Sequence, residues 1–441
     1  MNKTKNDISW ENLFKKHKIL ENINKNGFYE IESSLINTER EARLMAKFDH
    51  YINLPKIFKD NKLSILPISR NKYIIGNYNL YQKIEYNPKI ENIPIDLPNF
   101  IETIDYSNLY SESSALHYAF ISGMIENIIE EPAYFTVSGR MSTSNFTFNT
   151  NDINNNIYEI NVNNSQCEID AGFESKNCFL LIEAKNYKID DFLIRQLYYP
   201  YRLWKNKISK KIIPALMTFS NDVFSFFIYD FENILNYNSL VLKKQLNFII
   251  APEIIQLSDI LLILEQTKII KEPEVPFPQA DKFERIIDLL GLLVEKDLTK
   301  DEISENYQFD IRQADYYTNA GIYLNLIDKY TSNESKEILY SLSNKGRQIM
   351  RQKHKNKYLS LVKCILEHEI FNKVLTKYIK NGNLPIKKEV IEIMKNSYIF
   401  NVGKDSTTIE RRSSSVIGWV DWILKLTENF LFFSPKNNLF T

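Results

Sequence analysis

The chain has 441 residues, of which 44% are hydrophobic and 25% charged, a composition that excludes a wholly disordered protein and predicts two or three folded domains. Lysine plus arginine and aspartate plus glutamate both total 55, so the net charge neither identifies a nucleic-acid-binding protein nor excludes one. The three cysteines, Cys167, Cys178 and Cys364, form no C-x-x-C pair, which argues against a zinc knuckle and, with no apolar run of signal-peptide length or bilayer-spanning length, predicts a cytoplasmic protein.

The first predicted region covers residues 1–105 and mixes helical with strand-like patterns. In "TEREARLMAKFDHYIN" a threonine cap and acidic residues precede apolar residues at helical spacing, which predicts a helix from Thr38 to roughly Asn53. The alternating pattern of "KLSILPISRNKYIIGNY" predicts a β-hairpin. This α/β region shows no catalytic constellation, and contact with DNA stays open as a role for it.

Residues 106–272 are predicted to form the central domain, an α/β core with a mixed sheet. The segment "SESSALHYAFISGMIENIIEE", beginning at Ser111, predicts one helix that ends before a proline. Five strand-like runs follow, and Gly172 with the polar "ESKN" is expected to turn the last two into a hairpin. Next, "DDFLIRQLYYPYRLW" predicts an amphipathic helix with Asp190 and Asp191 in its first turn. Two further strands are separated by "SND".

The proline-rich segment "EPEVPFPQA" predicts a stiff linker, with a domain boundary near residue 275. Beyond it, residues 281–355 show three helical patterns and then two strand-like runs around the polar tip "SNES", which is the element order of a winged helix-turn-helix. Residues 356–441 predict a second helical, winged-helix-like DNA-binding domain, with Ser406 or Thr407 as a helix cap.

The carboxy-terminal part of the chain is basic and holds most of the candidate DNA contacts. Between positions 345 and 425 there are 17 Lys/Arg and 7 Asp/Glu, an excess that suits a polyanionic partner. Arg312 and Gln313 begin a predicted recognition helix, where they either read base edges or form a charged surface with neighbouring aspartates. Arg411 and Arg412 have few acidic neighbours, so we expect them to contact phosphates.

The chemistry-bearing residues lie at the end of an apolar strand, in "CFLLIEAKNY". Residues i and i+2 of a strand share a face, so Glu183 and Lys185 are expected side by side, with Ala184 pointing away. Asp170 lies on the preceding strand of the predicted hairpin and reaches the same end of the sheet. Two carboxylates and an ammonium at one point suit a Mg²⁺ ion that holds a scissile phosphate.

This arrangement resembles the PD-(D/E)XK nuclease superfamily. The residues that carry the resemblance are Asp170 in "CEIDAGF" and Glu183 and Lys185 in "LIEAKNY", followed by "DDFLIRQLYYPYRLW". With "SESSALHYAFISGMIEN" and "SGRMSTSNFTF" ahead of the expected winged helices, the pattern is similar to a group of prokaryotic type II restriction endonucleases over about residues 30–425. One departure is Ile169, which stands where the superfamily pattern has a proline.

The resemblance implies a restriction-endonuclease-like mixed-sheet core flanked by helices. It further implies Mg²⁺-dependent cleavage of double-stranded DNA to 5′-phosphate and 3′-hydroxyl ends. In that scheme Asp170 and Glu183 are metal ligands, the Ala184 carbonyl is a third ligand, and Lys185 orients or helps to deprotonate the attacking water. A homodimeric state and a cognate DNA methyltransferase as functional counterpart also follow from the resemblance.

Four further residues have two interpretations each. Glu112 is either an additional acid of the site or a plain N-terminal helix acid. Glu168 either touches a second metal ion or is solvated. Gln196 is either a functional residue, which contacts a phosphate or holds a ligand, or an ordinary polar helix residue. Arg140 either clamps DNA or caps a turn.

Two other functions stay open beside the restriction endonuclease. One is a winged-helix DNA-binding regulator without catalysis, although such a protein has no reason to gather two acids near DNA. The other is a DNA repair or junction-resolving nuclease with the same chemistry. The sequence contains neither G-x-x-x-x-G-K nor G-x-G-x-x-G, and its five histidines are scattered, so ATP-driven, redox and zinc chemistry are unsupported.

Overall fold

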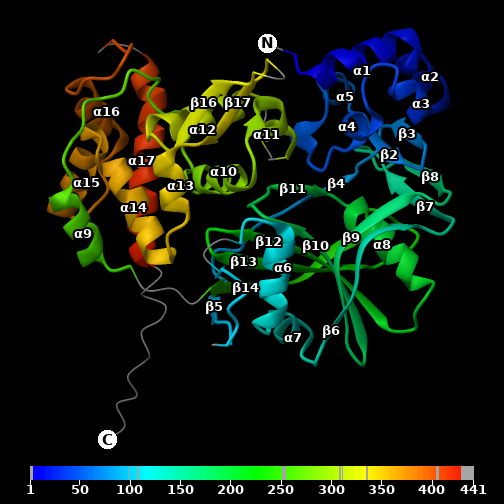
Figure 1. Cartoon of the computed structure of the whole chain (residues 1–441). Helices are drawn as coiled ribbons and strands as arrows, with labels where there is room; N and C mark the ends of the chain where they lie inside the picture. The colour runs from blue at the N-terminus through cyan, green and yellow to red at the C-terminus, as the bar shows by residue number, and fades with distance from the viewer. Residues whose placement is uncertain are drawn as a thin grey trace, which may run out of the picture. The chain divides into compact units, whose positions relative to one another are not determined.

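The computed structural model describes residues 3–98, 100–106, 109–250, 255–306, 309, 311–333, 336–403 and 407–428 (Figure 1). The chain divides into two compact units, which are described separately. Unit 1 comprises Met1–Phe100, Ser111–Phe248 and Ser304–Asp310, and unit 2 comprises Ile101–Tyr110, Ile249–Ile303 and Ile311–Thr441. None of the described helices is long and apolar enough to cross a membrane.

Unit 1 begins with a small helical and β region. Helix α1 (Lys5–Lys16) starts with a capping box between Thr4 and Asp7, which satisfies amide groups that the first helical turn leaves unpaired. It continues into α2 (Ile19–Asn26), and α5 (Lys56–Asp60) packs against α1. The three-stranded sheet has the order β1-β3-β2, and the predicted hairpin is confirmed as β2 (Ser64–Pro67) antiparallel to β3 (Lys72–Gly76). Strand β1 is Phe28–Glu32, and the short helix α3 is Ser33–Ile36.

The long helix predicted from Thr38 to Asn53 is wrong. The structure has the five-residue helix α4 (Ala42–Ala46) and a 3-10 turn, Tyr51–Asn53. Between them the backbone leaves the helical region at Lys47 (φ −95°, ψ 88°) and is extended at His50 (φ −126°, ψ 145°). Long-range contacts of this segment, described below, replace the helical hydrogen bonds that its apolar spacing predicts.

The core of unit 1 is a seven-stranded sheet with the order β5-β14-β13-β12-β10-β9-β6 (Figure 1). Strand β10 (Cys178–Lys185) is buried along its whole length, pairs antiparallel with β9 (Gln166–Glu174) and runs parallel to β12 (Lys211–Ser220). The expected mixed sheet is therefore confirmed. The other strands are β5 (Asn92–Ile95), β6 (Tyr134–Ser142), β13 (Val223–Phe231) and β14 (Leu240–Ile250). A separate pair joins β7 (Phe146–Asn151) to β8 (Ile157–Val162).

Glycines explain two local differences from the predicted core. The helix expected from Ser111 is two helices, α6 (Glu112–Ile121) and α7 (Met124–Ile129), because Gly123 adopts a left-handed conformation (φ 82°). Gly172 lies inside β9 and not in the turn, and a Cβ atom there would come within 2.9 Å of the Phe179 ring. Its role is to leave room for the Phe179 ring of the neighbouring strand.

The helix after β10 begins later than predicted. Helix α8 is Arg195–Lys205, and Asp191 belongs to the short strand β11 (Asp191–Leu193). Strand β11 pairs with β4 (Tyr81–Lys83), a segment more than a hundred positions away in the chain, so local periodicity does not reveal it. Asp190 and Asp191 therefore do not occupy the first turn of α8.

The predicted order of three helices followed by a two-stranded hairpin is present along the chain, mostly in unit 2, with residues 304–306 of the second helix assigned to unit 1. The helices are α10 (Phe283–Glu295), α11 (Lys300–Asn306) and α12 (Ile311–Tyr323). Strands β16 (Ile327–Thr331) and β17 (Ile338–Leu342) form the expected antiparallel hairpin, and the short β15 (Leu298–Thr299) adds to β17. Two positions of the "SNES" tip, Glu334 and Ser335, lie outside the described residues.

The rest of unit 2 is helical. The elements are α9 (Leu257–Gln266), α13 (Asn344–Met350), α14 (His354–Leu366), α15 (Glu369–Asn381), α16 (Lys387–Lys395) and α17 (Thr407–Glu428). From residue 354 onward the described residues contain helices and no strand, so the winged-helix-like second domain has no wing there. Ser406, one of the expected caps, lies outside the described residues.

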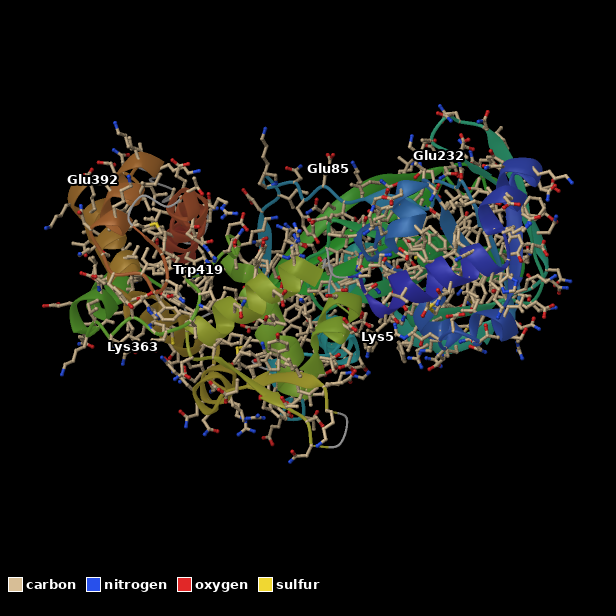
Figure 2. The ribbon with its side chains drawn as sticks, turned by 90° about the horizontal axis from the view of Figure 1, so that it is seen from above. Lys5, Glu85, Glu232, Lys363, Glu392 and Trp419 are labelled. Carbon is tan, nitrogen blue, oxygen red and sulfur yellow. The ribbon has the colours of Figure 1, made fainter. Side chains whose placement is uncertain are left out.

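The proline-rich segment is packed into unit 2 and does not separate domains. Phe277 is 1% exposed and stacks on Phe371. Trp419 of α17 (Figure 2) donates a hydrogen bond from its indole nitrogen to the Ala280 carbonyl at 2.6 Å. Unit 2 already includes Ile249–Ile303, so none of the points at which the chain passes between the units lies near residue 275.

Candidate active site

The site is built where strands β9 and β10 separate. The β9–β10 ladder pairs Phe179–Ile182 with Ala171–Glu174. Past it, the Ala184 amide donates a hydrogen bond to the Asp170 carboxylate, Oδ2, at 2.8 Å. Because the N–H and C=O of one strand residue face the same neighbour, the Ala184 carbonyl is also directed to the Asp170 side of β10. One edge of the strand therefore presents a carboxylate and a carbonyl oxygen together.

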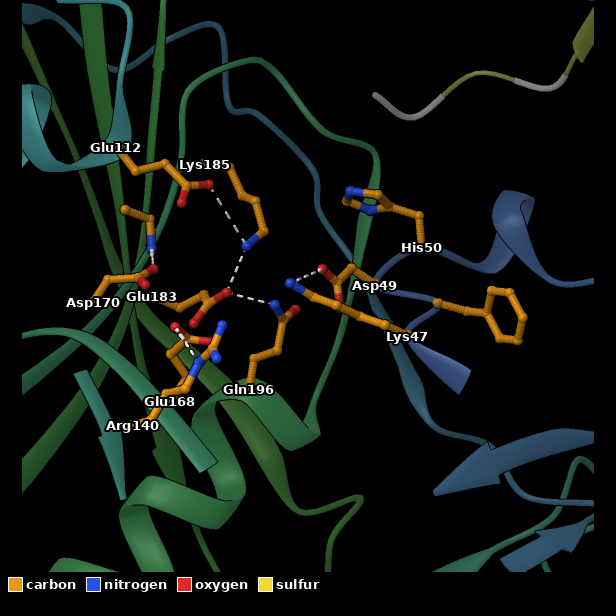
Figure 3. A network of polar contacts seen from close by, with 12 residues as sticks. Lys47, Asp49, His50, Glu112, Arg140, Glu168, Asp170, Glu183, Lys185 and Gln196 are labelled. Atoms are coloured by element: carbon orange, nitrogen blue, oxygen red, sulfur yellow. Dashed lines mark hydrogen bonds and ion pairs between the residues drawn. The ribbon is translucent and has the colours of Figure 1, made fainter. Parts of the chain in front are cut away.

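Glu183 and Lys185 stand side by side, as their spacing predicts. The Lys185 ammonium lies 2.5 Å from Glu183 Oε1, and both residues are buried, at 6% and 7% exposure. The Gln196 side chain also donates to Glu183 Oε1, from the second position of α8. On the other side, Glu112 at the start of α6 lies 3.9 Å from the Lys185 ammonium. Figure 3 shows these side chains converging.

Burial and mutual repulsion shift the titration of the acidic groups. Burial, followed by the neighbouring charge of Asp170, raises the pKa of Glu183 to about 8. Burial likewise raises the pKa of Asp170 and of Glu112, against the opposing charge of Lys185. For Lys185, burial favours the neutral amine, but the surrounding carboxyl groups outweigh it and raise the pKa of the ammonium well above its ordinary value. The Lys185 side chain therefore stays protonated and positively charged.

Asp170, Glu183 and the Ala184 carbonyl fit a Mg²⁺ ion by their chemistry. All three offer oxygen, and Mg²⁺ is usually bound through one or two carboxylates while water and phosphate oxygens complete its shell. Among the described residues, no group of three or more His, Cys, Asp or Glu side chains is placed to hold a metal ion. Because burial is the main cause of the raised pKa of Asp170 and Glu183, a cation bound to these carboxylates would lower both pKa values.

Two of the other candidates pair with each other. Arg140 on β6 faces Glu168 on β9 in the strand register, and the Arg140 Nε lies 3.3 Å from Glu168 Oε1 with both side chains about half exposed. The charge of Glu168 acts to raise the pKa of Asp170. The turn-capping interpretation of Arg140 is wrong, since Arg140 lies within a strand.

The structure adds a segment that sequence reasoning missed, Lys47–Tyr51. The His50 Nδ1 lies 2.7 Å from the Asp191 carbonyl oxygen and its Nε2 lies 3.2 Å from the Tyr187 hydroxyl. A carbonyl oxygen only accepts, so Nδ1 carries a proton. In addition, the Leu193 amide donates to the Asp49 carbonyl at 3.0 Å. These contacts hold the segment on the connection between β10 and α8.

Asp49 and Lys47 thereby reach the edge of the acidic cluster (Figure 3). The Lys47 ammonium lies 3.7 Å from Asp49 Oδ2. Burial acts to raise the pKa of Asp49, but the positive charges of Lys185 and Lys47, with others, hold it below its ordinary value. Nothing in "AKFDHY" marks these residues, because no local spacing relates them to a strand end far along the chain.

Apart from Arg140 of unit 1, the DNA-binding candidates lie in unit 2, at two places. Arg312 is exposed and Gln313 half-buried near the start of α12. On α17, Arg411 is exposed, whereas the Arg412 guanidinium donates to the Phe277 carbonyl, and burial lowers the pKa of Arg412. Arg412 thus holds the proline-rich segment, and the expected phosphate contact is better placed at Arg411.

Three family models match the chain, and each describes a domain of unknown function. Residues 7–75 match DUF6996, residues 76–249 match DUF6997 and residues 285–428 match DUF7226. No curated protein and no solved structure matches the chain. The acids and the lysine of the site all lie in the second match, and the segment Lys47–Tyr51 lies in the first.

Proposed function

We propose that the protein is a Mg²⁺-dependent, site-specific endonuclease of double-stranded DNA, a type II restriction enzyme. The observation that carries the proposal is the strand-end cluster, in which Asp170, Glu183 and the ammonium of Lys185 meet at the point where β9 and β10 part. Burial raises the pKa of both acids against the charge of Lys185, and a divalent cation held by them would favour their ionised forms and stabilise a bound phosphate.

Each residue of the cluster has a role in this proposal. Asp170, Glu183 and the Ala184 carbonyl hold Mg²⁺, which when bound supplies electrostatic stabilisation of the phosphate oxygens. Gln196 and Lys185 fix the Glu183 carboxylate through hydrogen bonds to one oxygen, Oε1, and leave Oε2 to the ion. The raised pKa of Lys185 favours a lysine that orients water and offsets charge on the phosphate over one that removes a proton.

The arrangement of the elements supports a restriction-endonuclease-like core and a DNA-binding carboxy-terminal unit. Helices α6 and α8 flank a hairpin, β9–β10, whose second strand runs parallel to β12. Along the chain, helices α10, α11 and α12 precede the β16–β17 hairpin, in the order of a winged helix-turn-helix. We propose α12 as the recognition helix. A type II enzyme of this kind implies a cognate DNA methyltransferase that protects the host genome.

The test is cleavage of plasmid DNA by the purified protein in Mg²⁺ and in EDTA, followed by sequencing of the ends. We expect cuts at discrete sites in Mg²⁺ alone, with Lys185→Ala and Asp170→Ala each abolishing them. Lys210→Ala is a matched control, because Lys210 also lies 2.5 Å from a glutamate, Glu174, at the other end of the β9–β10 hairpin. It should cleave like the wild type.

Three outcomes would contradict the proposal. Near wild-type cleavage by Lys185→Ala or Asp170→Ala would show that these residues do not form the active site. Sequence-specific binding without cleavage under any divalent ion would favour a regulator. Cleavage confined to branched or damaged DNA would favour a repair or junction-resolving nuclease.

A further inference from the structure

The amino-terminal part of unit 1 brings its own charged side chains to the candidate active site. Helix α4 ends at Ala46, and the next residues cross to the β10–α8 connection. There His50 contacts the Asp191 carbonyl and the Tyr187 hydroxyl, and Asp191 Oδ2 accepts from the Tyr51 amide at 3.2 Å. Tyr81 of β4 adds a hydrogen bond to the Phe48 carbonyl at 2.8 Å. Contacts from the β10–α8 connection and from β4 therefore hold the segment in place.

This fixation directs the side chain of Lys47 toward the acidic cluster. Figure 3 shows its ammonium reaching from the amino-terminal segment past Asp49 toward Gln196 and Lys185. Its charge is felt inside the cluster, where it acts to lower the pKa of both Glu112 and Asp170. Lys47 thus belongs to the electrostatics of the site although it lies outside the matched region that holds the acids.

Solvent access separates the two lysines of the cluster. The Lys185 side chain is 8% exposed and the Lys47 side chain 55% exposed. The Asp49 side chain, which pairs with Lys47, is 20% exposed. Its Oδ1 is buried without a hydrogen-bond partner among the described residues. A polyanion that approaches the acids first meets the exposed ammonium, while Asp49 limits where that ammonium can lie.

We propose that Lys47 is a DNA-phosphate contact of the active site, positioned by Asp49, so that the amino-terminal part of unit 1 completes the nuclease centre. The inference rests on the proposed nuclease function. The Lys47 side chain is 55% exposed, and an ion pair with one such solvent-exposed partner contributes little to folding. Removal of the Lys47 charge should therefore change DNA binding without changing stability.

The test measures duplex binding by the full chain in EDTA, where no cleavage intervenes, over a series of salt concentrations. For Lys47→Gln we expect weaker binding and a slope of log K against log salt that is reduced by about one unit, the effect of one lost phosphate contact. Lys47→Arg, which keeps the charge, should restore the slope. Lys56→Gln is the matched control, because Lys56 is 56% exposed and paired with Asp60 in the same region.

The outcomes separate this inference from the function on which it rests. If the wild-type protein cleaves DNA and Lys47→Gln keeps the wild-type slope, the Lys47 contact is wrong and the nuclease stands. An equal loss of slope in Lys56→Gln would also overturn it, since the effect would then be general surface charge. A lowered thermal midpoint with an unchanged slope would make Lys47 a structural residue. If the wild type neither binds nor cuts DNA, both proposals fail.

Discussion

Folding disfavours the ionised form of Glu183, which is the form that the proposed Mg²⁺ site requires. It is 7% exposed, and burial together with the Asp170 charge raises its pKa to about 8. An unfolded glutamate titrates near 4.3, so between about pH 4.3 and 8 the folded protein binds a proton that the unfolded chain releases. Stability from this group is then fully present at low pH and is lost as pH rises toward 8.

We therefore expect Glu183→Gln to stabilise the protein relative to the wild type by much more at pH 8.5 than at pH 5.5, where the wild type has lost only the part of this stability that falls between about pH 4.3 and 5.5. Glutamine keeps the shape of the side chain but has no proton to lose. Linkage allows at most about 1.4 kcal/mol per pH unit for one proton. Thermal midpoints of both proteins in EDTA at the two pH values measure the difference, and a constant difference would show that Glu183 titrates normally.

Mg²⁺ should stabilise the folded protein, because an ion that binds only the folded state adds its binding free energy. At a concentration 100 times the dissociation constant the gain is about 2.7 kcal/mol. We expect the thermal midpoint to rise with Mg²⁺ in the wild type and in Lys47→Gln, but not in Asp170→Asn. This readout is independent of cleavage, and a midpoint of Asp170→Asn that still rises would place the ion elsewhere.

The local spacing of residues predicted the part of the site that a single hairpin carries. Glu183 and Lys185 are two positions apart on one strand, and the structure pairs them at 2.5 Å. Asp170 follows from the hairpin itself. Lys47 and Asp49 were not predicted, because their place depends on the His50 contact with Asp191, and no pattern within a window of residues encodes a contact at that separation.

At the scale of elements, the strands were easier to predict than the helix boundaries. Alternation and apolar runs located β9, β10, β12 and β13 because side-chain burial repeats every two residues. Helix α8 begins after the predicted start because Asp191–Leu193 form strand β11, whose pairing with β4 is a tertiary effect. The prediction that Gly172 lies in the turn was wrong, because a glycine is also found inside a strand where a neighbouring side chain lies close to the backbone.

Gly172→Ala should destabilise the β9–β10 hairpin. The new Cβ would lie 2.9 Å from the Phe179 ring and 3.1 Å from the Val137 Cβ, and overpacking of this kind costs about 1–3 kcal/mol. Since Asp170 is on the same strand, cleavage should fall as well. Gly403→Ala is the control, because nothing lies within 4 Å of a Cβ there. Equal urea midpoints for the two variants would mean that the hairpin yields without cost.

The recognition helix makes a separate prediction about specificity. Arg312→Ala should increase cleavage at near-cognate sites relative to the true site. The free-energy difference between the two should fall by about 1–3 kcal/mol, the value of one base contact. Arg411→Ala should lower affinity for all sequences alike. Arg412→Ala should instead lower stability, since its guanidinium holds the Phe277 carbonyl. Cleavage of cognate and singly substituted duplexes decides the first two, and an unchanged ratio for Arg312→Ala would leave it a surface charge.

At the scale of the molecule, the proline-rich segment changes where the second unit begins. Prolines suggested a linker, yet Phe277 is buried and the Ala280 carbonyl accepts from Trp419. The stiffness that proline gives a free chain equally suits a segment packed along helices, so composition alone does not distinguish the two. A cut at residue 281 would remove part of the core of unit 2.

A fragment of residues 256–441 should therefore be more stable than one of residues 281–441. Both keep the wing and α12, so DNA affinity at low salt should persist wherever the fragment is folded, and should fall steeply with salt. Thermal denaturation followed by circular dichroism compares the two. Equal midpoints would show that the packed segment is dispensable, and a folded fragment without affinity for DNA would contradict the proposed role of unit 2.

The His50 contacts finally have a consequence for how such proteins can diverge. They tie two regions that family models match separately, residues 7–75 and 76–249. A gene exchange that joined a foreign first region to this second one would preserve every acid of the cluster. It would nevertheless replace the segment that faces those acids, so the two regions are expected to be inherited together, and to accumulate compensating substitutions at Lys47–Tyr51 and at Tyr187–Leu193.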